Sequence, residues 1–276
     1  MNPALKENVL GDQFAAVDRA FSKQSQHYDE DDRANPILQD MREQVYAHVN
    51  MYLKPGSSIL ELNAGTGIDA VHFAASGHRV HATDLSTGMI SQIMTKIHLP
   101  IVQDRLTCQQ LSYDQLNLVD GRKFDYVFSN FGGLNCIQDL GNVTKHLVPL
   151  LNAEGFATFI IMPPVSLWEL TWILKGNLRQ AFRRLHKNGV KAHLEGEFFE
   201  TYYHSLKKIK NAFGPQFKLI RTEGLCSVSP PPSPAEFVVK HPKLYKTLRR
   251  LDSWVRHVPP FNRWADHLIV TFKLGR

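Results

Sequence analysis

Two glycines and two carboxylates stand at spacings that could hold a ligand containing a nucleoside. Gly65 and Gly67 follow a short apolar run, and glycines there permit a tight turn whose backbone N–H groups approach a ligand closely. Glu61 lies within the apolar run, where a charge needs a cationic or N–H partner. Asp84 ends the next apolar run, 17 residues after Gly67. Because an ionised Asp only accepts hydrogen bonds, Asp84 could receive both hydroxyls of a ribose.

A parallel sheet would bring these residues together. The apolar runs that predict its strands are 58–62, 79–83, 105–108, 124–129, 156–162, 217–226 and 265–273. Helical segments at 66–75, 87–97 and 138–151 alternate with the first five, and such alternation is typical of right-handed crossovers between parallel strands. The predicted fold class is therefore α/β, with a doubly wound, mostly parallel, seven-stranded sheet. Its ligand would bind beyond the carboxyl ends of the strands, where the Gly65 turn lies.

The other segments are predicted to cover this edge of the sheet. Residues 1–53 have apolar residues at helical spacing, with an acidic break at residues 28–32. Beyond Pro163-Pro164, helices are predicted at 167–185, 205–213 and 245–257, and a strand within residues 197–205. We expect an N-terminal helical lid, 1–53, and a sheet domain, 54–276. Insertions at about 163–204 and 229–264 would roof an acceptor pocket in that domain.

The glycine pair by itself leaves the cofactor open. Gly65-x-Gly67-x-x-Ala70 also satisfies a loose dinucleotide fingerprint, so a nicotinamide-dependent oxidoreductase is one alternative. Three features favour a sulfonium ligand instead. A charge, Glu61, stands inside the first strand, helices precede that strand, and the polar segment 129–135 (SNFGGLN) follows the fourth strand.

With these residues the sequence resembles the class I S-adenosylmethionine-dependent methyltransferases, over about residues 14–162. The family's E-L-G-C-G-T-G loop stands here as ELNAGTG at 61–67, and its F-D-x-V strand as FDYV at 124–127. Phe21, Tyr28 and Asp29 resemble the F…YD segment of the ubiquinone/biotin-pathway-like subgroup. The resemblance implies a Rossmann-like methyltransferase fold, S-adenosyl-L-methionine as cofactor and S-adenosyl-L-homocysteine as product. The implied cofactor-binding residues are Tyr28, Glu61, Asn63, Ala64, Gly65, Thr66, Gly67, Asp84, Leu85, Met89, Gln109, Gln110, Leu111, Asn130, Phe131 and Gly132.

Two positions depart from the family pattern. Asn63 replaces the first loop glycine, which is tolerable because Asn adopts left-handed backbone angles at modest cost. After the third strand, where the family often has an acidic residue for the adenine amine, the chain has Gln109 and Gln110. A Gln amide oxygen or a backbone carbonyl would have to make that contact.

The acceptor side is predicted from the aromatic, basic second part of the chain. Aromatic residues of its first insertion would make an apolar pocket: Trp168, Trp172, Phe198, Phe199, Tyr202 and Tyr203. The basic helix carrying Arg183 and Arg184 is typical of a solvated face. Alternatively, Arg183 or Arg184 could pair with an anionic group of the acceptor, or the helix could contact a membrane. His204 is the candidate catalytic base, and His267 a candidate base or acceptor contact. The predicted acceptor contacts are Trp168, Trp172, Arg183, Tyr202, Tyr203 and His267. Whether O, N or C is methylated stays open.

The charge is unevenly distributed, with a net charge of −6 over residues 1–162 and +12 over residues 163–276. A basic half could face nucleic acid or an anionic membrane, so a lipid or prenyl-tailed acceptor at a membrane surface is a second alternative. A nucleic-acid methyltransferase is disfavoured, because no DPPY-type motif follows the fourth strand and no Pro-Cys nucleophile is present. The histidines form no HxH or HExxH pattern, so no metal is expected. With no leader and no long apolar run, we expect a cytoplasmic protein with a small-molecule acceptor. The oligomeric state stays open.

Overall fold

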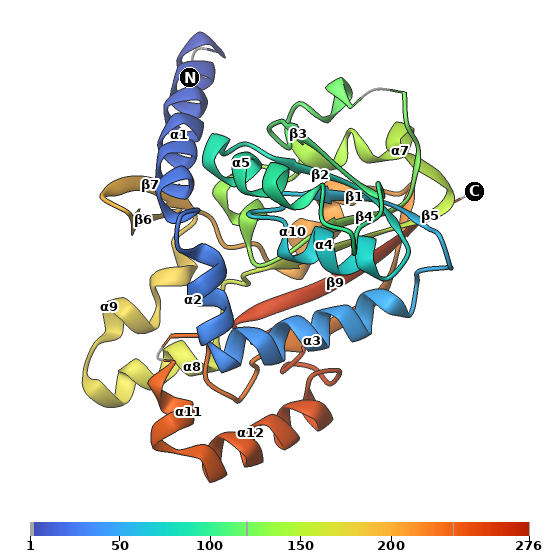
Figure 1. Cartoon of the computed structure of the whole chain (residues 1–276). Helices are drawn as coiled ribbons and strands as arrows, with labels where there is room; N and C mark the ends of the chain where they lie inside the picture. Colours follow the sequence, from blue (N-terminus) through green and yellow to red (C-terminus); the bar gives the residue numbers. More distant parts are fainter. Residues whose placement is uncertain (1–2, 120, 234, 276) are drawn as a thin grey trace.

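A seven-stranded sheet forms the centre of the protein in the computed structural model, which describes residues 3–119, 121–233 and 235–275 (Figure 1). Its strands are β1 Ser58–Leu62, β2 Arg79–Asp84, β3 Leu106–Gln110, β4 Phe124–Ser129, β5 Leu151–Ile161, β8 Phe217–Leu225 and β9 His267–Leu274. Their order is β3-β2-β1-β4-β5-β9-β8, and only β9 runs antiparallel to its neighbours. This confirms the doubly wound, mostly parallel sheet. The strand order reverses between β1 and β4, which is where such sheets bind ligands.

Helices cover both faces of the sheet and extend beyond it. The α-helices are α1 Pro3–Gln24, α2 Tyr28–Ala34, α3 Pro36–Asn50, α4 Ile68–Ala75, α5 Thr87–Lys96, α6 Gly141–Thr144, α7 Leu147–Leu150, α8 Leu167–Leu170, α9 Leu178–Ala181, α10 Leu206–Phe213, α11 Glu236–Lys240 and α12 Pro242–Val255. Short 3₁₀ turns are η1 Leu116–Leu118, η2 Gly133–Cys136, η3 Thr171–Lys175 and η4 Arg183–Leu185. A separate hairpin pairs β6 Val190–Leu194 with β7 Glu197–Thr201. No helix in the described ranges is both long and apolar enough to span a bilayer.

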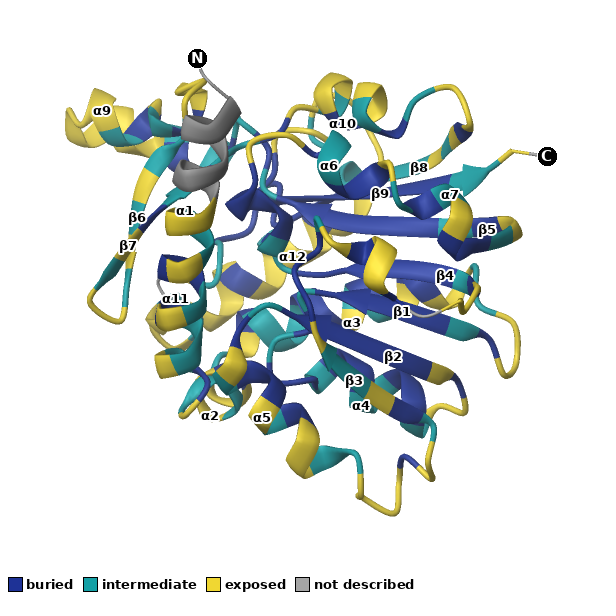
Figure 2. Cartoon of the chain, turned by 90° about the horizontal axis from the view of Figure 1, so that it is seen from above, coloured by how far each residue is buried: buried dark blue, intermediate teal, exposed yellow. Residues whose placement is uncertain are grey.

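Alternating side chains of the strands feed two buried cores, one on each face of the sheet. In β1, Ile59 points into the core formed with α3 and α4, whereas Leu60 and Leu62 point into the opposite core with α10. Figure 2 shows the sheet strands as a buried layer with exposed residues on the covering helices. Because β1 alternates strictly, Glu61 faces the same side as Ile59, toward α4.

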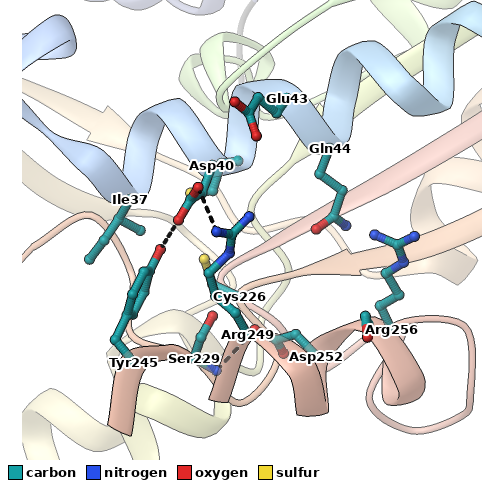
Figure 3. Close-up of a pocket in the computed structure, with 12 residues that line it drawn as sticks. Ile37, Asp40, Glu43, Gln44, Cys226, Ser229, Tyr245, Arg249, Asp252 and Arg256 are labelled. Atoms are coloured by element: carbon teal, nitrogen blue, oxygen red, sulfur yellow. Dashed lines mark hydrogen bonds and ion pairs between the residues drawn. The ribbon is translucent and has the colours of Figure 1, made fainter. Parts of the chain in front are cut away.

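A second layer of helix lies outside α3, where α12 packs against it (Figure 3). Asp40 of α3 accepts hydrogen bonds from the Tyr245 hydroxyl at 2.5 Å and pairs with Arg249 at 2.9 Å. Asp252 of α12 accepts the backbone N–H groups of Val228 and Ser229. The groove between the helices, about 260 Å³, is lined by acids and arginines that these contacts partly pair. The second insertion therefore packs on α3 and is not a roof over the ligand edge.

The structure corrects several predicted elements. The acidic run at 28–32 lies within helix α2, so it is helical and is not the break between helices that was predicted. The segment 138–151 forms two short helices, and β5 begins at Leu151, five residues before the predicted strand. The predicted helix at 167–185 is four short pieces, because Gly176 adopts a positive φ of 72° and Asn177 caps a new turn. Strand β6 and helix α11 were not predicted.

Candidate cofactor and acceptor site

A cavity of about 350 Å³ opens at the carboxyl ends of β1, β2 and β4, under α1, α2 and the β6–β7 hairpin. Its walls are mainly apolar. They comprise Val17, Phe21, Tyr28, Asn63, Gly65, Asp84, Leu85, Met89, Tyr113, Asn130, Phe131, Gly132, Gly133, Cys136, Met162, Ala192, His193, Leu194, Phe199 and Thr201. Nine predicted cofactor residues are thus brought to one cavity, namely Tyr28, Asn63, Gly65, Asp84, Leu85, Met89, Asn130, Phe131 and Gly132. A smaller hollow beside it also reaches Ala64 and Thr66.

Two backbone N–H groups hold the Asp84 carboxylate at the cavity. The carboxylate accepts the backbone N–H of Gly65 at 2.8 Å and that of Ser86 at 2.8 Å. Burial raises the pKa of Asp84 to about 6, and these N–H bonds oppose that rise. Ser86 caps α5 through its own hydroxyl, so Asp84 is not needed as the helix cap. Each carboxylate oxygen keeps a lone pair for a ligand hydroxyl.

The glycine turn leaves room for a ligand. Gly65 adopts a φ of 58°, and a Cβ built on it would meet nothing within 4 Å. Asn63 adopts a φ of 45°, as its place in the family loop requires, and its side chain is fixed by Ser129 and the Asn130 carbonyl. Glu61 lies beneath the turn, where burial and the charge of Asp69 raise its pKa well above the usual range. Its Oε2 is buried and has no hydrogen-bond partner among the described residues.

A buried ionic cluster ties the N-terminal helices to this edge. Arg42 of α3 pairs with Asp32 of α2 and with Asp69 of α4. Asp69 also accepts hydrogen bonds from Tyr46 and Asn130, and the Arg42 guanidinium lies 4.8 Å from the centre of the Phe131 ring. Asp69 therefore has a buried structural role. Arg42 had no sequence signal beyond its helix.

Helix α2 also contacts the glycine turn directly. The Asp29 carboxylate accepts hydrogen bonds from the Thr66 hydroxyl and from Lys96, and Lys96 also donates to the Thr66 carbonyl. Burial raises the pKa of Tyr28 to about 12, so its hydroxyl stays protonated in the cavity wall. The predicted Tyr28-Asp29 segment thus lies on the turn, with Tyr28 facing the cavity and Asp29 holding the loop.

Helix α1 closes the cavity by docking on the start of α5. Asp18 accepts the N–H of Thr87, and the Ser22 hydroxyl accepts the N–H of Gly88, so α1 supplies partners for two free N–H groups of that helix. On its other side, Gln13 exchanges hydrogen bonds with the backbone of Glu200 in β7. The hairpin, α1 and α5 therefore form one cover.

The predicted adenine contacts lie outside the cavity wall that the described residues form. Gln109 contacts His81 and the Leu118 carbonyl, and Gln110 donates to Leu85 and Thr87. Leu111 is buried and donates its N–H to the Asp84 carbonyl. Tyr113, which sequence reasoning missed, lines the cavity instead, and its buried hydroxyl has no partner in the described residues. Glu61 and Gly67 also lie behind the wall.

Most predicted acceptor contacts are engaged elsewhere. Trp168 packs on Phe237 of α11 with ring centres 5.6 Å apart, and Trp172 contacts Lys175. Arg183 pairs with Glu169, and Arg184 is buried between Glu169 and Asp266. Tyr203 lies under the Arg184 guanidinium, and Tyr202 packs against Gly189. Of the six aromatics expected to line the pocket, the structure places Phe199 in the cavity wall.

Neither candidate histidine is in the cavity lining, and the two have different surroundings. His204 is fully buried, its Nε2 bonds the Ile137 carbonyl, and burial lowers its pKa to about 4. It lies away from the cavity and is placed as a packing residue. His267 begins β9, with its ring centre 6.1 Å from that of Phe131, and a Cβ built on Gly132 would lie 3.4 Å from its Nε2. Its Nδ1 bonds Asp266 at 2.9 Å.

This sheet, with its glycine turn and Asp84 at the switch point, has counterparts among known proteins. Residues 59–155 match the family model described as a methyltransferase domain. Residues 59–155 of the chain therefore form a methyltransferase domain. The match ends within β5, so the covering helices α1 and α2 and the β6–β7 hairpin lie outside it. No curated protein sequence matches the chain significantly.

Solved structures share the methyltransferase fold at low identity. A proposed S-adenosylmethionine-dependent methyltransferase from Listeria monocytogenes aligns with a TM-score of 0.56 and 17% identity, over 84% of this chain and 96% of that one. Phosphoethanolamine N-methyltransferase 2 of Haemonchus contortus, with phosphomonomethylethanolamine and S-adenosylhomocysteine bound, aligns with a TM-score of 0.52 and 16% identity, over 84% of this chain and 52% of that one. The [4+2]-cyclase SpnF aligns with a TM-score of 0.52 and 12% identity, over 81% of this chain and 76% of that one. At these identities the likeness shows the fold alone.

Proposed function

We propose that this methyltransferase domain transfers the methyl group of S-adenosylmethionine to a small, apolar or aromatic acceptor. The observation that carries the proposal is Asp84, whose carboxylate lies beside the open Gly65 turn in a cavity closed by apolar side chains. When bound, S-adenosylmethionine supplies an activated methyl group on a sulfonium. The protein's own contribution is to align the reactants and to exclude water.

The residues at the turn fit the polar parts of this cofactor. Asp84 would accept hydrogen bonds from the ribose hydroxyls, and the backbone around Gly65 is open to a ligand. Glu61 keeps a buried oxygen without a partner among the described residues, which favours a donor such as an ammonium group nearby. Tyr113 lines the cavity with a buried hydroxyl that has no partner among the described residues, so it could meet the base of the cofactor.

The acceptor would lie on the side of the hairpin, where the cavity is apolar. Phe21 of α1 and Phe199 of β7 pack with ring centres 5.8 Å apart, and both line the cavity. Met162 follows β5 and closes the far side. Side chains of this kind favour an apolar or aromatic body.

His267 would take a proton from such an acceptor. With its Nδ1–H donated to Asp266, its Nε2 carries a lone pair on the side of Gly132. Burial opposes ionisation of Asp266, but its hydrogen bonds with His267 and Arg184 and the charge of Arg184 hold its pKa well below the usual range. The carboxylate would therefore stay ionised and orient the ring. His267 thus replaces His204 as the proposed base.

Calorimetric titration tests the cofactor. We expect S-adenosylmethionine and S-adenosylhomocysteine to bind, and Asp84→Asn to weaken both by about 1.5–3 kcal/mol, the range for hydrogen bonds to a charged group. Asp104→Asn is the matched control, since Asp104 is exposed and lies outside the cavity wall. Unchanged affinity in Asp84→Asn, or binding of NADH at the same site, would refute the assignment.

Release of S-adenosylhomocysteine tests the reaction. The protein is incubated with S-adenosylmethionine and a panel of small phenols and aromatic amines, and methylated products are identified by mass spectrometry. With an acceptor found, we expect His267→Gln to lower kcat at neutral pH and to leave cofactor affinity unchanged. If the cofactor binds tightly but no panel member is methylated, this acceptor class is wrong while the cofactor assignment holds.

A further inference from the structure

Two segments of the C-terminal half present large apolar side chains to solvent. On residues 171–185 these are Trp172, Ile173, Leu174, Leu178, Phe182 and Leu185, and on residues 239–264 they are Val239, Leu244, Leu251, Trp254, Val258 and Trp264. Leu174, Val239 and Trp254, at 88%, 81% and 76% exposed, are the three most exposed large hydrophobic side chains of the described residues. Soluble monomers rarely gather so many apolar groups outside a binding surface.

The two segments lie together at one end of the molecule. Trp168 of α8 packs edge-on against Phe237 of α11, which joins the first segment to the second. Figure 1 shows α8 beside α11, with α9 and α12 extending from them on the side of the molecule away from α5 and β3. We call the outward side of these two segments the cationic–apolar face.

Helix α12 shows how this face is patterned. Tyr245 points to Asp40 of α3 and Asp252 to the backbone of Val228 and Ser229, so the opposite side of the helix faces solvent. On that side Leu244, Leu251 and Trp254 recur at helical spacing and form an apolar stripe. A parallel stripe at positions 243, 246 and 250 holds two lysines and an arginine, all exposed. An outward face with apolar and cationic stripes is typical of a helix that lies in a membrane interface.

The charges of the face are largely free. Six cations on the two segments form no ion pair with any described residue: Lys175, Arg179, Lys243, Lys246, Arg250 and Arg263. Asp252 is the one acid within residues 171–185 and 239–264, and it is buried. A partner for this face must therefore offer both negative charge and an apolar layer.

We propose that the cationic–apolar face binds the surface of an anionic lipid bilayer, with α12 parallel to the membrane plane. Lysines and arginines would contact the headgroups while Leu174, Val239 and Trp254 enter the boundary of the acyl chains. A nucleic acid would pair with the cations but would offer no layer for the aliphatic side chains. A second copy would bring like charges together. The inference does not depend on the proposed methyl transfer.

Sedimentation with vesicles tests the inference on the full chain. We expect binding to vesicles of equal parts phosphatidylglycerol and phosphatidylcholine, and little binding to pure phosphatidylcholine. The α12 variant Lys243→Gln/Lys246→Gln/Arg250→Gln should bind the anionic vesicles at least about tenfold more weakly. The apolar variant Leu174→Ser/Val239→Ser/Trp254→Ser should lose the vesicle binding that persists at high salt concentration. Lys207→Gln/Lys210→Gln/Lys218→Gln is the matched control, because these exposed lysines lie on α10 and β8.

Three results would overturn the inference. The first is wild-type protein that does not sediment with the anionic vesicles. The second is a control variant that loses as much binding as the α12 variant, because the effect would then come from net charge alone. The third is an apolar variant that binds vesicles as well as the wild-type protein, with RNA displacing both proteins from the vesicles. That result would make the face a polyanion site. Circular dichroism of each variant confirms its fold.

Discussion

At the scale of single residues, the raised pKa of Asp84 couples cofactor binding to pH. Burial places this pKa at about 6, and ribose hydroxyls are bound by the ionised carboxylate. Below pH 6 the Asp84 carboxyl of the free protein is mostly protonated, and it must release this proton when the cofactor binds. Cofactor affinity should therefore fall as pH is lowered through 6, by up to about tenfold per unit. Calorimetry across this range measures the slope, and Asp84→Asn should bind more weakly but show no such slope. The same slope in the variant would assign the titration to another group.

The sequence predicts those residues whose role depends on local spacing. Asp84 and Gly65 are found because a strand, a turn and a strand end follow one another at fixed intervals. Arg42 and Tyr113 were missed, because an Arg on an amphipathic helix and a Tyr after a strand carry no local sign of what they face. His204 was chosen over His267 for the same reason, since only the packing of β9 against Gly132 separates them.

At the scale of elements, the docking of α1 on α5 depends on Gly88. A Cβ built there would lie 2.6 Å from the backbone of Ser22, so Gly88→Ala must push α1 away while α5 itself accepts alanine well. We expect faster hydrogen exchange in α1 and, through loss of Val17 and Phe21 from the cavity wall, cofactor affinity lowered about tenfold. Gly11→Ala is the matched control on α1, where a Cβ meets nothing within 4 Å. Unchanged exchange and affinity in Gly88→Ala would mean that α1 is no lid.

Elements were predicted well where hydrophobic periodicity is sustained and poorly where a turn interrupts it. Strands β1, β2 and β4 have continuous apolar runs, and the structure keeps them within a residue of the prediction. Strand β6 was missed because its turn to β7 uses Glu195 and Gly196, both at positive φ, and Glu is rare at such a position. The break of helix 167–185 at Gly176 had a signal, since Gly followed by Asn is typical of a helix end and a new cap.

At the scale of the whole molecule, the N-terminal helices divide into a cover and a part of the core. Helix α1 contacts the sheet domain through polar groups around α5 and the hairpin and through a small apolar cluster that includes Phe199 and Cys136. Helix α3 instead buries Ile37, Met41, Val45 and Val49 against the sheet. Its His48 bonds both Glu223 and Thr271, at 2.8 and 2.6 Å, and joins α3 to β8 and β9. The predicted boundary at residue 53 thus falls after a helix that packs as core.

Two truncations separate these roles. Removing residues 1–27 deletes α1 but keeps Asp32 and Arg42, so we expect a folded protein with a modestly lower melting temperature and weak cofactor binding. Removing residues 1–53 deletes α3 and exposes its side of the core. Four fully buried apolar side chains contribute about 1.5–3 kcal/mol each, which together approaches the whole stability of a typical domain. That protein should show no cooperative melting by circular dichroism. Glu223 would also lose its hydrogen bond with His48, which helps to lower the pKa of Glu223 to about 2 although burial raises it. If it melted cooperatively near the wild-type temperature, α3 would be a removable cover, and residues 54–276 would be an independent domain as the sequence predicts.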